Sequence, residues 1–390
     1  MNLDAKRERL LSGMMGVAVA DAAALGLHWI YDIKRIKDVG GDAPEFIDPD
    51  QKNYHGVPSY FAHPEKTAGD NSHYGENFLN AARSIANSGG VFNPRIYQRD
   101  FQDFFGPGGN FRGYIDHPTK DTLQNLKDAE LKAVERVSAD FKDLDQDLRE
   151  TLMMKIMPVT KNHTGPKLLA KVEEAVRITH DDDKILKMAR DMAKSVDQTI
   201  PLDSGAYDDQ IPALAGVLPL IASGNSNLSD VEVIVKITNN HEKSVAAGRF
   251  FAKLLLAVIE GEALAEAFKE AKPELPMDWQ ESTQKAMTRD WPDDEALIEE
   301  FGAACPLRYS LPVGLNIIRT SNSYTAAVRQ NIRLSGDNCG RALLTGALAG
   351  ILWGIGGERG IPHPWLWKIK DQETKFQSLW QLIKKYNAEM

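Results

Sequence analysis

Three short segments of the 390-residue chain place acidic, amide, hydroxyl and imidazole side chains beside runs of small residues. The first segment, residues 13–32, is rich in glycine and alanine and carries Asp21 inside its apolar run. A carboxylate in such surroundings is costly to bury unless it is paired, hydrogen-bonded or close to a metal. Small residues at three- and four-residue spacing also allow a second helix to approach closely, so a packing role for this segment stays open.

The second segment, residues 68–76, places Asp70, Asn71, Ser72 and His73 directly before a helical pattern. Two interpretations remain open. An Asp or Ser at this place can cap the helix, with a glutamate in the first turn that favours the helix dipole. Alternatively, the helix N-terminus presents polar side chains and free amide groups to an anionic ligand.

The third segment, residues 334–341, leads into another helix of small residues. Asp337 can cap this helix or act in a site. Arg341 lies in the first turn, where a cation is unfavourable for the helix dipole, so we expect it to have a carboxylate or phosphate partner. Cys339 stands at the same helix N-terminus, which would lower the pKa of its thiol and raise its reactivity. A buried, inert cysteine is the alternative.

Helical periodicity dominates the elements that must position these segments. Apolar residues recur mostly at three- and four-residue intervals in five stretches, which are residues 6–29, 75–86, 119–157, 340–354 and 371–386. Strand-like alternation is almost absent from the chain. The sequence therefore predicts an all-α protein.

The middle of the chain contains an internal echo, in which residues 172–194 resemble residues 231–253. Each unit reads as a short helix, a polar turn and a longer helix. The sequence predicts Thr179 and Thr238 as N-caps, because a threonine hydroxyl can accept from the free amides of the following helix. We expect the two helical hairpins to pack side by side.

Proline-rich irregular stretches interrupt the helical pattern near residues 38–72 and 265–313. Both are predicted to be loop-rich insertions, and the second is expected to contain short helices. Long loops of this kind in compact domains are usually functional. No Ser/Gly tract or low-complexity run separates the chain into parts. We therefore expect a single compact domain over residues 1–390, with a core large enough to need no disulfide or metal for folding.

The net charge of −9 argues against nucleic acid and anionic membranes as partners, although it leaves room for a locally positive pocket. The apolar stretch at residues 347–356 is too short to cross a bilayer. Two widely separated cysteines and a charged N-terminus without a secretory pattern lead us to expect a cytoplasmic protein. We expect four loop histidines that have no partner spacing to lie at the surface, namely His55, His63, His117 and His163.

Taken together and in order, the three segments resemble the ADP-ribosylglycohydrolase family. Residues 13–22 look like the Gly-x-x-x-Gly-x-Ala-x-Gly-Asp-Ala helix with which its members open. Residues 336–350 look like its Gly-Asp-x-Asp-Thr motif and the Gly/Ala-rich helix that follows. Residues 20–32 and 69–75 are more specifically similar to the J1-crystallin and selenoprotein J branch. The resemblance covers nearly the whole chain and implies the family's compact multi-helix fold.

Active members of this family hold two magnesium ions with the side chains of a Thr-Asp-Asp motif and of the Asp-x-Asp-Thr motif. In this sequence, residues 72–75 stand at the first motif, and Cys339 and Gly340 replace the second acid and the threonine of the other. The resemblance leaves Asp337, Ser72 and Asp32 as metal ligands. Magnesium fits histidine and cysteine poorly, so we expect at most one Mg²⁺ and no two-magnesium centre.

The resemblance implies a hydrolase of a glycosidic bond to ADP-ribose or a related ribosyl nucleotide. Its partner would be a small-molecule nucleotide or an ADP-ribosylated substrate. The predicted catalytic residues are Asp337, His73 and Asp70. The predicted substrate-binding residues are Asp21, His28, Trp29, Tyr31, Asn71, Tyr74, Asn338 and Arg341. The alternative, a non-catalytic ligand-binding or crystallin-like structural protein on the same fold, stays open, and so does the oligomeric state.

Overall fold

The computed structural model describes residues 3–140, 145–160, 165–180 and 182–386. Within these ranges every regular element is a helix, and β-pairing is limited to isolated bridges, so the predicted all-α class is confirmed. The α-helices (α) and 3-10 helices (η) follow one another as α1 Leu3–Ala24, η1 Leu25–Leu27, α2 Ile33–Gly40, η2 Gln51–Tyr54, α3 His73–Asn87, α4 Pro94–Phe105, α5 His117–Asp140, α6 Gln146–Thr160, α7 Gly165–Arg177, α8 Asp183–Thr199, η3 Ile211–Leu214, α9 Val217–Ala222, α10 Leu228–Thr238, α11 Glu242–Glu260, α12 Leu264–Ala271, η4 Lys272–Glu274, α13 Met277–Thr288, α14 Asp294–Phe301, α15 Leu307–Thr320, α16 Tyr324–Arg333, α17 Asn338–Trp353, α18 His363–Leu366 and α19 Gln372–Lys384.

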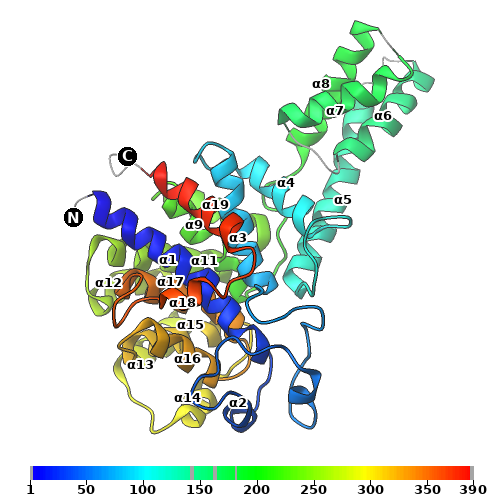
Figure 1. The fold of residues 1–390 in the computed structure, drawn as a ribbon. Coiled ribbons are helices and arrows are strands. Elements are labelled where there is room, and N and C mark those ends of the chain that lie inside the picture. Colours follow the sequence, from blue (N-terminus) through cyan, green and yellow to red (C-terminus); the bar gives the residue numbers. More distant parts are fainter. Residues whose placement is uncertain (1–2, 141–144, 161–164, 181, 387–390) are drawn as a thin grey trace.

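Buried apolar side chains form two separate clusters, which divide the described structure into a body and an arm. The arm consists of α5 to α8 and projects away from the body (Figure 1). Its own core includes Leu126, Ile156, Val172 and Leu186. The other helices pack around the larger cluster and form the body. The single domain over the whole chain stays a prediction, and the arm is its most independent part.

Two helices of small residues, α1 and α17, pack along each other in the body and form the largest helix–helix contact of the described structure. A Cβ atom on Gly16 would lie 2.3 Å from the carbonyl oxygen of Gly346, and one on Gly350 would lie 2.2 Å from that of Ser12. Non-bonded atoms in a close-packed interior do not approach so closely. Glycine is therefore required at these positions. The small residues of the segment 13–32 thus serve helix packing, one of the two roles that the sequence allowed for it.

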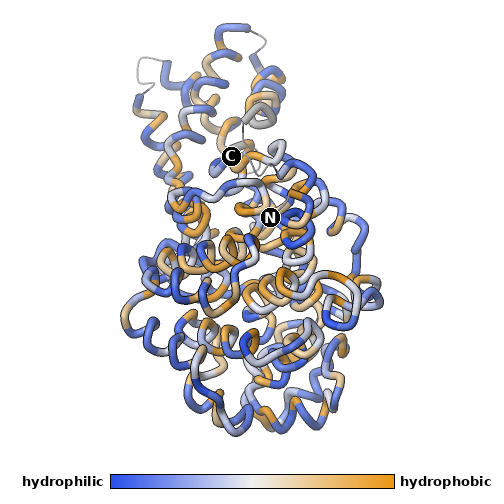
Figure 2. The backbone as a smooth tube through the Cα atoms, turned by 90° about the vertical axis from the view of Figure 1, so that its left-hand side faces the viewer, coloured by the Kyte–Doolittle hydropathy of each residue, from blue (hydrophilic) through white to orange (hydrophobic). Residues whose placement is uncertain are grey.

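Helix α1 owes its apolar character to this burial. By length and composition the stretch Leu3–Leu27 is apolar enough to cross a membrane, but 89% of its most apolar 18 residues are buried inside the protein. In Figure 2 the hydrophobic stretches of the chain lie along the helices, whereas the connecting loops at the outside are largely hydrophilic. The pattern is that of a core helix, because its apolar surface is covered by other helices.

The internal echo does form two helical hairpins, α7–α8 and α10–α11, but they do not lie side by side. The first belongs to the arm and the second to the body (Figure 1). The predicted N-caps are also wrong, because Asp182 and His241 cap the second helices. The hydroxyls of Thr179 and Thr238 instead donate back to the carbonyl oxygens three residues earlier, at the ends of the first helices.

The two irregular stretches turn out differently. Residues 41–72 are mostly loop, with one short 3-10 helix, and they run past the site described below. Residues 265–313 contain the expected short helices, which are α12, α13, α14 and the start of α15. These helices cover most of the stretch, so it has less loop than the prolines led us to expect. The prolines of that stretch mostly stand at helix starts, where a missing amide hydrogen costs nothing.

Candidate functional site

The candidate site lies where the N-termini of α3 and α17 meet the chain that leaves α1. Ser72 caps α3 and Asp337 caps α17, each accepting from an amide of the first turn. The amide of Trp29 donates to the carbonyl oxygen of Gly336 (2.9 Å), and the Gly336 amide donates to that of Ile30 (2.7 Å). Trp29 has φ 62°, a left-handed conformation that is unfavourable for a non-glycine residue. Such backbone strain is concentrated at functional sites.

Asp337 and two histidines form a buried chain of hydrogen bonds. The Nε2 atom of His28 lies 2.9 Å from Oδ1 of Asp337, and its Nδ1 atom lies 2.8 Å from Nε2 of His63. None of the three side chains is more than 2% exposed. Burial lowers the pKa of His28, against the opposing effect of Asp337. Burial, with smaller effects of the neighbouring His28, His73 and Lys66, also places the pKa of His63 well below its usual value. Both imidazoles are therefore neutral at neutral pH.

Asp21 is the second buried carboxylate, and it holds the start of α3 against α1. Its Oδ2 atom accepts from the amide of Ser72 (2.8 Å) and from Nδ2 of Asn71 (2.9 Å), and its Oδ1 atom accepts from the Ser72 hydroxyl. Nδ2 of Asn71 also donates to the carbonyl oxygen of Ala18, while its Oδ1 atom accepts from Nζ of Lys375 at 2.9 Å. Burial raises the pKa of Asp21, and the bonds from Ser72 and Asn71 oppose that shift. All these groups have partners within the protein, so Asp21 and Asn71 act in the scaffold of the site.

His73 faces a carboxylate that sequence reasoning did not single out. Its Nε2 atom lies 3.2 Å from Oδ2 of Asp116, and both side chains are buried. Burial alone would raise the pKa of Asp116, but the His73 charge and hydrogen bonds from His73 and Thr119 lower it overall. The His73 ring also contacts Trp29 and Tyr114, which pack edge to face against each other. His73 therefore lies between the carboxylate of Asp116 and the aromatic rings of Trp29 and Tyr114.

Between these two pairs lies a group of buried polar atoms that have no hydrogen-bond partner among the described residues. They include Oδ2 of Asp337, Nε1 of Trp29 and the hydroxyl of Tyr74. Burial and the nearby charges of Asp337, Cys305 and Asp116 raise the pKa of Tyr74. The Cys305 thiol interacts with Tyr74, Trp29 and Asp337, and burial raises its pKa well above the usual value. We call these four residues, Trp29, Tyr74, Cys305 and Asp337, the polar chamber.

The structure brings some of the predicted site residues together and places others elsewhere. Tyr31 is 37% exposed, and burial of its hydroxyl, with smaller effects of Cys305 and Asp337, raises its pKa. Asp32 instead caps α2 by accepting from the Arg35 amide, and Asp70 accepts from Thr67 in the loop before α3. Within the described residues neither carboxylate bonds to a residue of the polar chamber, because each is held by its own local turn.

Arg341 is fully buried, and its donors are directed to groups of the protein. They bond to the side chain and carbonyl oxygen of Asn331 and to the carbonyl oxygens of Ala303 and Ser335. Burial lowers its pKa to about 10, although the nearby Asp337 charge opposes the shift. The expected carboxylate or phosphate partner is thus replaced by an amide and three carbonyl oxygens. Asn338 lies beside it and donates to the carbonyl oxygen of Leu27 (3.2 Å), while its Oδ1 atom is buried without a partner among the described residues.

Cys339 does not have the reactive environment that the sequence suggested. Its thiol is fully buried and lies 3.6 Å from the carbonyl oxygen of Asp21. Burial raises its pKa well above the usual value, which outweighs any effect of the helix N-terminus. The hypothesis of a reactive Cys339 thiol is therefore wrong on this geometry, and the alternative of an inert cysteine holds.

Three site residues were not found from the sequence, namely His63, Asp116 and Cys305. The prediction that His63 lies at the surface is wrong, because its ring is 2% exposed and stacks on His28. His55 and His117 are exposed as expected, and His163 lies outside the described residues. A histidine in the long 41–72 loop was the available signal, since loops of that length often carry function.

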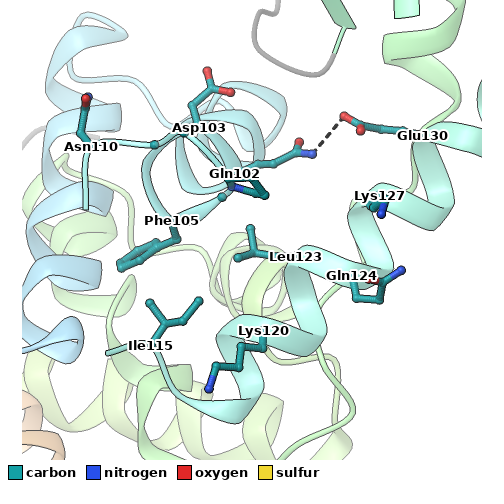
Figure 3. Close-up of a pocket in the computed structure, with 14 residues that line it drawn as sticks. Gln102, Asp103, Phe105, Asn110, Ile115, Lys120, Leu123, Gln124, Lys127 and Glu130 are labelled. Atoms are coloured by element: carbon teal, nitrogen blue, oxygen red, sulfur yellow. Dashed lines mark hydrogen bonds between the residues drawn. The ribbon is translucent and has the colours of Figure 1, made fainter. Parts of the chain in front are cut away.

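Two pockets border this region. A cavity of about 290 Å³ is lined by Tyr60, Phe61, His63, Lys66 and Tyr114 among others, and it lies beside the chain of histidines. A larger one of about 850 Å³ lies between α4, the loop after it and α5 (Figure 3). Figure 3 shows that Gln102 in this larger pocket is bonded to Glu130. Gln102 and Glu130 also bond to Arg99. The smaller pocket is closer to the polar chamber, because His63 bonds to His28, and Tyr60 and Tyr114 pack against Trp29.

The residues present do not fit the two-magnesium centre that the family resemblance implies. The family's two metal-binding motifs fall on residues 72–75 and 336–340, and Asp337 is the one carboxylate among these residues. Its Oδ1 atom is bonded to His28 and to the Gly340 amide. The Ser72 hydroxyl is bonded to Asp21. A Cβ atom on Gly340, where the family has threonine, would lie 2.3 Å from Oδ2 of Asp337. Across the described ranges, no group of three or more His, Cys, Asp or Glu side chains is arranged to hold a metal.

The lowered pKa of His63 predicts that acid destabilises the protein. The unfolded chain binds a proton near the ordinary value of 6.5, while the folded chain does so only at lower pH. Stability is therefore lost as the pH falls below 6.5, with a slope of up to about 1.4 kcal/mol per pH unit for this group. Urea unfolding at pH 7 and pH 5 should show a smaller difference for His63→Gln than for the wild type. An equal difference in both proteins would contradict the assignment.

Comparisons with known proteins agree with this architecture. A sequence model of the ADP-ribosylglycohydrolase family matches residues 2–228 and 213–390. Crystallin J1A of Tripedalia cystophora is 27% identical over 374 residues, which cover 94% of this chain and 93% of that protein. Crystallin J1B of the same organism is 24% identical over 381 residues, with the same coverage. A solved structure described as an ADP-ribosylglycohydrolase-related protein complex matches 98% of this chain and 100% of its own, with a TM-score of 0.60 and 15% identity, which shows the shared fold. The chain belongs to the ADP-ribosylglycohydrolase family.

Proposed function

We propose that this protein hydrolyses a glycosidic bond to ADP-ribose or a related ribosyl nucleotide without a two-magnesium centre. The observation that carries the proposal is the polar chamber, where Oδ2 of Asp337, Nε1 of Trp29 and the Tyr74 hydroxyl are buried with no hydrogen-bond partner among the described residues. Family membership supports the class of substrate. The donor chemistry of the motif positions supports the absence of metal from the reaction.

The energetics of burial favour a ligand at this place. A buried donor or acceptor without a partner costs about 1–3 kcal/mol, and three such atoms converge here. A protein that only needed a stable fold could carry apolar side chains in place of Trp29 and Tyr74, whose polar atoms have no partner among the described residues. Ribose hydroxyls are donors and acceptors of the right kind to satisfy a carboxylate oxygen, an indole N–H and a phenol. Binding such a ligand would therefore recover the cost of leaving these groups unpaired.

The proposed chemistry uses a carboxylate and an imidazole. Asp337 takes a proton from a water molecule, whose oxygen attacks the anomeric carbon while the bond to the leaving group breaks. His73, whose Nε2 atom faces Oδ2 of Asp116, gives a proton to the leaving group. One proton is accepted and one is donated, so the enzyme is restored by proton exchange with solvent. Tyr60 and Tyr114, which pack against Trp29, provide aromatic faces for the base of the nucleotide.

A second function is favoured by the two crystallin relatives, which match nearly the whole chain. On this alternative the protein is a non-catalytic, crystallin-like structural protein, for which solubility and stability suffice. The structural alternative explains why magnesium ligands are missing. It does not explain why the polar chamber contains buried polar atoms without a partner among the described residues.

Calorimetry with ADP-ribose, with Mg²⁺ or Mn²⁺ added in separate runs, tests the proposal. We expect ADP-ribose to bind without either metal, and Tyr114→Ala to weaken binding by about tenfold, as loss of one stacking face implies. Trp380→Ala is the control, because Trp380 is an exposed aromatic residue of α19. No heat of binding for ADP-ribose with or without metal would favour the structural alternative. Binding that requires Mg²⁺ would refute the metal-independent site.

A further inference from the structure

His28 stands between Asp337 and His63, and each of its ring nitrogens contacts one of them. The two distances, 2.9 Å to Oδ1 of Asp337 and 2.8 Å to Nε2 of His63, are those of hydrogen bonds. The two rings stack with an angle of 19° between their planes. All three groups come from different parts of the chain, since Asp337 is 309 residues from His28 and His63 is 35 residues from it.

The partners of this chain determine where its protons lie. A carboxylate can only accept, and Oδ1 of Asp337 also faces the Gly340 amide at 3.2 Å. Nε2 of His28 must therefore carry a hydrogen. A neutral imidazole has one donor and one acceptor, so Nδ1 of His28 is bare and accepts. It follows that Nε2 of His63 carries the hydrogen between the two rings, and that Nδ1 of His63 is bare.

Burial of both rings disfavours a charge on either of them, and this assignment requires both to be neutral. Burial is the main reason why the pKa of His63 is lowered, and the neighbouring His28, His73 and Lys66 lower it further. His28 faces His73 and Asp21 besides Asp337, and its complete burial opposes a charge. The backbone of His28 is held as well, because the Tyr54 hydroxyl donates to its carbonyl oxygen at 2.9 Å.

We infer that His63 is a positioning residue, whose Nε2–H holds His28 in the tautomer that donates to Asp337. Without that donor, the hydrogen of His28 could move to Nδ1, and a nitrogen lone pair would then face Oδ1 of Asp337. The carboxylate would turn or lose its orientation, since Oδ1 would keep the Gly340 amide as its remaining donor. His63 thus acts on Asp337 through His28. By analogy with residues that orient metal-binding histidines, we expect a contribution of about 10- to 100-fold to activity.

Nitrogen-15 NMR of histidine-labelled protein tests the inference without any turnover. A bare and a protonated ring nitrogen give distinct resonances, and a His28→Asn sample identifies the signals of His28 among the nine histidines. In the wild type we expect a protonated Nε2 and a bare Nδ1 at His28. In His63→Gln the amide can still donate to Nδ1, so the same tautomer should remain. In His63→Phe, which fills the space without a donor, both tautomers of His28 should appear.

The activity measurement rests on the proposed function, whereas the NMR measurement does not. With an ADP-ribosyl substrate, His63→Phe should lower kcat by about 10- to 100-fold with little change in KM, and His63→Gln should recover much of the loss. A wild-type His28 protonated at Nδ1 would overturn the inference even if His63→Phe does not fold. So would an unchanged His28 tautomer in folded His63→Phe. If the tautomers behave as expected but no variant and no wild-type protein turns over substrate, the proposed function fails and the positioning role stands.

Discussion

Asp337→Asn should lower kcat/KM for an ADP-ribosyl substrate by about a thousandfold, within the range for loss of a general base. Asparagine has the same shape, and its side-chain oxygen can still accept from the Gly340 amide at the start of α17. It cannot take a proton from water, and it presents a neutral amide where the polar chamber now has a carboxylate oxygen. The effect should therefore appear in turnover more than in stability, and both steady-state kinetics and thermal unfolding should be measured.

The matched control for this variant is Asp293→Asn. Asp293 is also a helix N-cap, since it accepts from the Ala296 amide at 2.8 Å, but it is exposed and belongs to α14. The two substitutions share the chemical change and the capping role, and they differ in access to the polar chamber. Asp293→Asn should leave kcat/KM unchanged. Full turnover by Asp337→Asn would remove Asp337 from the reaction and with it the proposed mechanism.

Gly346→Ala should lower the free energy of unfolding by about 2–3 kcal/mol, although alanine is intrinsically the better helix former. The added Cβ atom would lie 2.5 Å from the carbonyl oxygen of Gly16 and 2.9 Å from the Cβ atom of Ala20. The Gly16 oxygen belongs to the backbone of α1, so the clash cannot be relieved by a change of rotamer. The helices must separate instead, which loosens the contact that brings Asp21 and Asp337 into one site. Urea unfolding followed by circular dichroism measures the loss.

Gly314→Ala provides the comparison for this prediction. Gly314 also lies inside a helix, α15, but a Cβ atom there would meet the end of the Leu344 side chain at 2.7 Å. A flexible side chain can shift, so this variant should lose much less stability than Gly346→Ala. Equal losses in the two variants would show that the α1–α17 contact tolerates an extra methyl group.

Much of the fold could be predicted from the sequence, because helices depend on the spacing and type of residues close to one another in the chain. The three- and four-residue spacing of apolar side chains gives the helices, and most of their boundaries follow from capping residues such as Ser72 and Asp337. The small residues of α1 and α17 predict a close helix pair. The helical content of residues 265–313 was underestimated, because the prolines there stand mainly at helix starts and do not break the helices.

The candidate site could be predicted only in part, because its hydrogen bonds join distant parts of the chain. The three motifs and their order along the chain led to the prediction of Asp337, His28 and His73 as site residues. The residues next to His63 and Asp116 in the sequence give no sign that these two side chains contact His28 and His73. Burial also reversed two expectations about charge. Arg341 satisfies its donors with protein carbonyl and amide oxygens, and the thiol of Cys339 has a raised pKa at a helix N-terminus that by itself would lower it.

The sequence by itself therefore determined the helical class, the order of the three motifs, and the replacement of magnesium-binding side chains by histidine, cysteine and glycine. These properties depend on residue type and on spacing along the chain. The tertiary structure alone decided which groups pair and which stay unsatisfied. It paired His28 with His63, and it left Oδ2 of Asp337 buried without a partner among the described residues. The reason is that burial and hydrogen bonding depend on neighbours brought together by the packing of α1 against α17, which no local pattern specifies.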